Sequence, residues 1–210
     1  MKQTLFIIVL IITFAFAACN NSDSKNKHEI HDVNNVKSDT TQHVSSNEDA
    51  DIKTVAVVYK NVDVKTAAGI KEIVNQYLNI KNALANDNAV DAANGAEEMV
   101  IALAELDKSL FTTDQKKVFD ENQEELNENV EHISKNGNNI KHQRSHFVIV
   151  SELVYNLVKN FGAGRPLYHD HCPMARENQG AMWLSEVKEI KNPYFGSEMF
   201  KCGRVEEVIQ

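Results

Sequence analysis

The chain has 210 residues, 42% of them hydrophobic and 25% charged, and 30 acidic residues against 22 basic ones give it a formal charge of −8. This acidic balance argues against nucleic-acid binding, which depends on clustered lysine and arginine. The length that follows the N-terminal region is that of one domain with its own core.

Residues 1–18 have the pattern of a signal peptide. Lys2 gives a positive end, residues 5–12 form an apolar stretch too short to span a membrane comfortably, and small residues precede Cys19. Phe16-Ala17-Ala18-Cys19 resembles a bacterial lipobox and departs from it only at the phenylalanine, where leucine is usual. The pattern predicts that Cys19 carries palmitate and other acyl chains, which anchor the protein firmly. An ordinary signal peptide or membrane anchor is the alternative.

Residues 19–53 are rich in Asn, Ser, Asp, Lys, Thr and His, and we expect them to form a flexible polar tether behind the lipid. His28, His31 and His43 offer weak metal ligands there, although solvated polar filler is the simpler interpretation. Asn20 stands where an aspartate would indicate inner-membrane retention. We therefore expect an outer-membrane lipoprotein that faces the periplasm, with surface exposure as an alternative.

Apolar residues at helical spacing predict four helices between residues 64 and 161. The segments are about 64–85, about 89–108, a third from a Thr112–Gln115 capping box to about 135, and a fourth over 140–161 that Gly162 closes. Short connections favour antiparallel neighbours, so the expected fold is all-α, an up-down four-helix bundle over 54–165. Residues 54–62 are β-branched and fit either a short strand or an extended lead-in.

Residues 166–210 lose this periodicity and are crowded with Cys, His, Met, Pro and Gly. We expect them to form an irregular segment of the same domain, packed on the bundle with Trp183 and Phe195 as apolar anchors. A short hairpin around 198–209 is one option within it.

Five residues of this segment have side chains that soft cations prefer: His171, Cys172, Met174, Met199 and Cys202. Thiolate, thioether and imidazole together suit Cu(I) and Ag(I), so the set is a candidate metal site. The alternative is a disulfide between Cys172 and Cys202, as is usual for an exported protein with an even cysteine pair. Such a bond would stabilise the fold by roughly 3–4 kcal/mol. A redox-switchable combination is the third option.

His142 and His146 lie one helical turn apart on the fourth predicted helix and are possible additional ligands, and His132 lies on the third. Boundary histidines hydrogen-bonded to neighbours are the alternative. Gln143 stands where a zinc protease has its catalytic glutamate, which excludes hydrolysis by that route. The sequence contains no nucleophile elbow, phosphate loop or dinucleotide fingerprint, and we expect no enzyme.

Several motifs resemble one known family. They are Tyr77-Leu78, Lys81-Asn82-Ala83-Leu84, Ile140 to Phe147, Tyr168 to Ala175, Gly180 to Ser185, Glu189 to Gly196, Met199 and Cys202-Gly203. Over about residues 65–210 the chain is similar to the domain-of-unknown-function 3347 family. Domains of this family occur as free-standing lipoproteins and appended to adaptor subunits of CusB-type copper and silver efflux systems.

This resemblance implies a link to heavy-metal resistance but no assigned reaction. We therefore expect a membrane-tethered periplasmic module that binds a soft ion, Cu(I) or Ag(I), for buffering or delivery to a heavy-metal efflux adaptor. The rival is a structural or interaction lipoprotein with a Cys172–Cys202 disulfide and no metal. An oxidoreductase acting through these cysteines comes third, because they lack the Cys-x-x-Cys spacing.

Overall fold

The structure, a computed structural model, describes residues 52–210, which belong to one compact unit. The predicted signal peptide (1–18), the predicted lipidated Cys19 and nearly all of the predicted tether (19–53) lie outside the described residues. The tether histidines lie there too.

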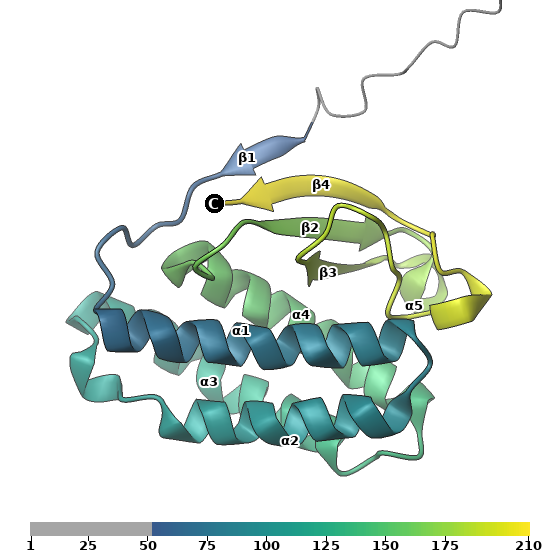
Figure 1. Cartoon of the computed structure of the whole chain (residues 1–210), viewed down its shortest axis with the longest axis horizontal. Helices are drawn as coiled ribbons and strands as arrows, with labels where there is room; N and C mark the ends of the chain where they lie inside the picture. The colour runs from purple at the N-terminus through teal and green to yellow at the C-terminus, as the bar shows by residue number, and fades with distance from the viewer. Residues whose placement is uncertain (1–51) are drawn as a thin grey trace, which may run out of the picture. The chain divides into compact units, whose positions relative to one another are not determined.

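Four long helices make up most of the described chain (Figure 1). They are α1 (Val64–Ala85), α2 (Ala89–Glu105), α3 (Thr113–Ser134) and α4 (Ile140–Phe161). The predicted helical segments are confirmed, except that α2 ends at Glu105 and a short 3-10 turn, η2 (Lys108–Leu110), follows it. Each helix packs against the next one, and α1 also contacts α4.

Local signals fix where these helices begin and end. The predicted capping box is formed, because the Thr112 hydroxyl accepts a hydrogen bond from the Gln115 amide and the Gln115 side chain accepts one from the Thr112 amide. At the other end of the helical region, Gly162 adopts a φ of 78°, which ends α4. These boundaries place His132 in the last turn of α3 and His142 in the first turn of α4.

The prediction of an all-α fold is wrong, because residues 166–210 contribute three strands to a mixed sheet. The strands are β1 (Lys53–Val55), β2 (Leu167–Cys172), β3 (Ala181–Ser185) and β4 (Arg204–Ile209), in the order β1-β4-β2-β3. Strands therefore form more than a third of the segment that was predicted to be irregular. Two short helical turns, α5 (Ala175–Asn178) and η3 (Gly196–Glu198), lie in its connections.

The pairing of β4 explains why the hairpin around 198–209, one option for this segment, does not form. β4 pairs antiparallel with β2, with Leu167 opposite Ile209, and parallel with β1, with Lys53 opposite Glu207. Both partners come from distant parts of the chain, and a pattern of local turns does not reveal them. β1 supplies the short strand that was one option for the lead-in, although it begins one residue earlier than expected.

The sheet packs on the helices through β3, which contacts α4 and α1 (Figure 1). Trp183 of β3 is fully buried and Phe195 packs against the core, as predicted for these apolar anchors. The Leu184 amide donates a hydrogen bond of 2.8 Å to the Tyr77 hydroxyl of α1. Apolar packing and this buried hydrogen bond thus hold the C-terminal segment against α1 and α4.

Candidate metal centre

Three histidines come together where α3 and α4 meet. His132 lies in the last turn of α3, and the five-residue turn after Ser134 reverses the chain so that His142 and His146 of α4 face His132. Each histidine offers one ring nitrogen, and these three atoms lie within 4.8 Å of one another. No other group of three or more His, Cys, Asp or Glu side chains in residues 52–210 has this arrangement.

The rings are in direct contact. The His132 and His146 rings stack with their centroids 4.3 Å apart and their planes 1° from parallel, and the His142 ring meets His146 at 4.5 Å and 60°. His132 is exposed and the other two are half-buried. The cluster therefore opens to solvent on the side of His132.

Asn129 fixes the orientation of His146. The Asn129 side-chain amide donates to the Glu125 carbonyl at 2.8 Å, so its oxygen is the atom that contacts Nδ1 of His146, also at 2.8 Å. Because that oxygen can only accept, Nδ1 must carry the hydrogen, and Nε2 keeps its lone pair. Metal-binding histidines are held in this way by a hydrogen bond to their second ring nitrogen.

The environment favours a neutral His146. Burial lowers its pKa, and the neighbouring His132 and His142 lower it further, while Glu128 acts in the opposite direction. A histidine must be unprotonated to bind a metal, and crowding three imidazoles together disfavours their protonated forms.

The geometry of the cluster is close to what an ion requires. Zn–N bonds of 2.0–2.1 Å in a tetrahedral site place ligand nitrogens about 3.3 Å apart. Ring nitrogens within 4.8 Å reach that separation by small side-chain rotations, with the exposed His132 moving most. Three imidazoles suit zinc, copper, iron and nickel, and they would leave one position open for water or a ligand from a partner.

The sulfur-containing residues of the predicted site are arranged differently. Cys172 is fully buried at the end of β2, and its Sγ lies 2.6 Å from Sγ of Cys202. Two thiolates that share one ion at about 2.3 Å each would be separated by well over 3 Å. The structure brings the cysteines together but leaves no space for an ion between them.

The strand β2 also separates neighbours in the sequence. Successive side chains of a strand point to opposite faces, so His171 is half-buried beside Glu206 at 3.5 Å while Cys172 points into the core. Met174 follows the strand and is 47% exposed, and Met199 follows η3. The set expected from an irregular loop is thus divided by a strand: Cys172 meets Cys202, and His171 faces away from both.

His132 is the member of the cluster that sequence reasoning left out of its candidate site. It lies ten residues before His142, across a helix boundary, and helical periodicity does not relate the two positions. The available signal was the strong Asn136–Asn139 turn, which predicts that the end of α3 and the start of α4 lie side by side.

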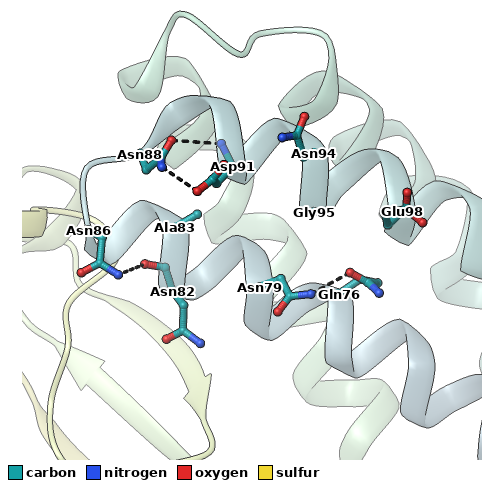
Figure 2. Close-up of a pocket in the computed structure, with 10 residues that line it drawn as sticks. All are labelled: Gln76, Asn79, Asn82, Ala83, Asn86, Asn88, Asp91, Asn94, Gly95 and Glu98. Carbon is teal, nitrogen blue, oxygen red and sulfur yellow. Dashed lines mark hydrogen bonds between the residues drawn. The ribbon is translucent and has the colours of Figure 1, made fainter.

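A groove of about 510 Å³ lies between α1 and α2 (Figure 2). Six of its ten lining residues are Asn or Gln, and several bond to one another, as Asn79 does to Gln76 at 2.8 Å and Asn88 to Asp91 at 2.6 Å. The described residues that line it include neither histidine nor cysteine. It therefore offers no soft ligand, and the histidine cluster remains the candidate site.

Within residues 52–210, every helix is too short or too polar to cross a membrane.

Comparison with known protein families shows that residues 73–165 fit the model of a family described as protein of unknown function (DUF3347). No curated protein and no solved structure matches the chain. The matched residues run from α1 past the end of α4 and include all three histidines of the cluster. Over residues 73–165, the chain therefore matches the DUF3347 family, as its sequence motifs predicted.

Proposed function

We propose that this protein is a lipid-anchored extracytoplasmic module that binds one transition-metal ion through His132, His142 and His146. It buffers the ion or passes it to a heavy-metal efflux adaptor. The observation that carries the proposal is the convergence of three ring nitrogens within 4.8 Å. We further propose that the four helices form an antiparallel up-down bundle, because their connections are short.

The donor atoms narrow the class of ion. Imidazole nitrogens favour copper and zinc over the hard ions magnesium and calcium, and copper lies above zinc in the general order of affinities. Cu(I) and Ag(I), which the sequence favoured through its sulfur residues, remain candidates because imidazole also binds copper. The ligands of the proposed site are nitrogen atoms, with the cysteines playing a separate role.

The lipid anchor is inferred from the N-terminal sequence. Delivery of the ion to an efflux adaptor is inferred from the family resemblance. The lipobox-like Phe16–Cys19 segment supports lipidation of Cys19, and Asn20, which stands where an aspartate would indicate inner-membrane retention, supports the outer membrane. An open coordination position on the side of the exposed His132 supports transfer of the ion. An acceptor protein can add its own ligand to the ion there before the histidines of this protein dissociate from it.

Titration of the full chain with Cu(II), Zn(II) and, under anaerobic conditions, Cu(I) tests the proposal. We expect one ion per chain in the wild type and loss of that ion in His142→Ala and His146→Ala. His171→Ala is the matched control, because His171 is a half-buried histidine on β2. Binding that survives the two α4 variants would contradict the site.

A second candidate function is a structural or interaction lipoprotein that binds no metal. The facing thiols of Cys172 and Cys202 favour this function, because a disulfide between them would stabilise the fold. The same titration separates the two, since this alternative predicts no stoichiometric binding of any of the three ions.

A further inference from the structure

Cys172 and Cys202 are brought together by the register of the sheet. Cys172 ends β2, and β4 begins two residues after Cys202, with Arg204 opposite His171. Antiparallel pairing at this register brings the residues before Arg204 alongside the end of β2. The two Sγ atoms lie 2.6 Å apart as a result.

The surroundings of Cys202 hold its backbone in place. The Asn192 side chain donates a hydrogen bond of 2.7 Å to the Cys202 carbonyl, and the Cys202 amide donates one of 3.0 Å to the Met199 carbonyl. The next residue, Gly203, has a φ of 139° and leaves no room for a side chain, since a Cβ there would lie 2.8 Å from the Trp183 ring. The loop before β4 is therefore fixed against β3 and β2.

The pair is also shielded. Cys172 is fully buried and Cys202 is half-buried, so large reagents have no approach to the first sulfur. A separation of 2.6 Å excludes a bridging ion and is closer to the S–S bond length of about 2.05 Å than to the spacing of metal-bound thiolates.

We propose that Cys172 and Cys202 form a disulfide bond that joins the end of β2 to the loop before β4 in the exported protein. The two thiols lose two protons and two electrons, and a bond forms between their sulfurs. The oxidant is an extracytoplasmic disulfide, whose own S–S bond breaks to give two thiols. The proposal is independent of metal binding and holds whether or not the histidine cluster binds an ion.

The bond is structural and does not act as a redox catalyst. Burial and, to a smaller extent, the adjacent Cys172 together raise the pKa of the Cys202 thiol to about 11. Catalytic and sensor cysteines have lowered pKa values that populate the thiolate, whereas the raised pKa of Cys202 disfavours its thiolate. We therefore expect the disulfide to form during folding and then to resist exchange.

Peptide mapping of the full chain, purified from cells that export it and alkylated in denaturant, tests the proposal. Trypsin releases residues 160–176 and 202–204 as separate peptides, each with one cysteine. We expect the unreduced digest to contain them as one linked peptide, with a mass two hydrogen atoms below the sum of the two. Recovery of both peptides alkylated, without prior reduction, would overturn the proposal.

Thermal unfolding supplies a second measurement. We expect Cys172→Ala, Cys202→Ser and the double variant to lower Tm equally, by on the order of 10 °C. Wild type that is reduced in denaturant and refolded in the presence of reductant should show a similar drop in Tm, and the same treatment should leave the variants unchanged. This comparison separates loss of the bond from loss of packing. An equal Tm for the reduced and the untreated wild type would overturn the proposal. This comparison does not depend on whether a variant folds.

Discussion

Asn129 Oδ1 accepts a hydrogen bond of 2.8 Å from Nδ1 of His146, and Asn129 is itself fixed by the bond that it donates to the Glu125 carbonyl. This relationship sets the tautomer of His146 and leaves Nε2 with a lone pair. It makes Asn129 a positioning residue, because it is not itself among the proposed metal ligands.

We predict that Asn129→Leu weakens metal binding roughly 10–100-fold, the usual effect of removing a partner of a metal-bound histidine. Asn122→Leu is the matched control, because Asn122 makes the same type of bond to a carbonyl of α3, that of Val118, at 2.8 Å. Calorimetric titration measures the affinities, and ¹⁵N NMR of the His146 ring reports the tautomer. Equal losses of affinity in the two variants would contradict a positioning role.

Metal should stabilise the fold, because a ligand that binds only the native state lowers its free energy. At an ion concentration one hundred times Kd, we expect a gain of about 2.7 kcal/mol in the free energy of unfolding, which a chelator reverses. His142→Ala should lose this gain, and Mg²⁺ should give none because imidazole has little affinity for it. Urea unfolding with and without the ion is the measurement, and an undiminished gain in His142→Ala would argue against the site.

Asp170 predicts a dependence of stability on pH. It is fully buried, and burial raises its pKa to about 8 although the charge of Lys81 acts in the opposite direction. The folded protein keeps the proton that the unfolded chain loses near pH 4. Asp170 therefore costs no stability below about pH 4, and its cost grows as the pH rises until it levels off above the folded pKa.

We expect Asp170→Asn to remove this cost, at roughly 1.4 kcal/mol for each unit of pKa shift that is relieved. The variant should gain on the wild type as the pH rises from 5 to 8, as measured by urea unfolding. The comparison cancels the titration of the histidines, which both proteins share. A difference between the two proteins that is the same at pH 5 and pH 8 would show that Asp170 has an ordinary pKa.

Arg144 of α4 ties the turn between α1 and α2 to the C-terminal segment. Its guanidinium lies 2.6 Å from an Asp87 carboxylate oxygen and donates to the carbonyls of Leu84 and Pro193 at 2.9 and 2.8 Å. The Arg144 side chain is only 16% exposed, so its loss leaves these acceptors without a partner. Gly196 packs directly on this pair, where a Cβ would overlap both side chains.

Arg144→Ala should destabilise the fold by about 2–4 kcal/mol, since two partly buried charged hydrogen bonds to carbonyls are lost together with the ion pair to the exposed Asp87. Lys116→Ala is the control, because Lys116 pairs with Asp120 one turn away on an exposed helix surface and such pairs contribute about 0.5 kcal/mol or less. Urea unfolding of both variants checks the ranking. Similar losses in the two would mean that solvent replaces the contacts of Arg144.

The four helices could be predicted because their determinants are local. Helix hydrogen bonds join residues four apart, and the apolar face of Ile70, Ile73, Val74 and Tyr77 follows that period. The capping box at Thr112 and the stop at Gly162 each lie within a few residues of the boundary that they set. His142 and His146 share a face for the same reason.

The sheet, the Cys172–Cys202 pair and the histidine cluster all depend on residues that are far apart in the sequence. β4 finds its partners in β1 and β2, and that pairing decides that Cys172 meets Cys202 while His171 points away. The histidine cluster likewise needs the packing of α3 against α4, which adds His132. The sequence by itself determined the helices and the types of side chain available for chemistry. Only the tertiary structure decided which of them meet, because strand pairing and helix packing join positions that no local period connects.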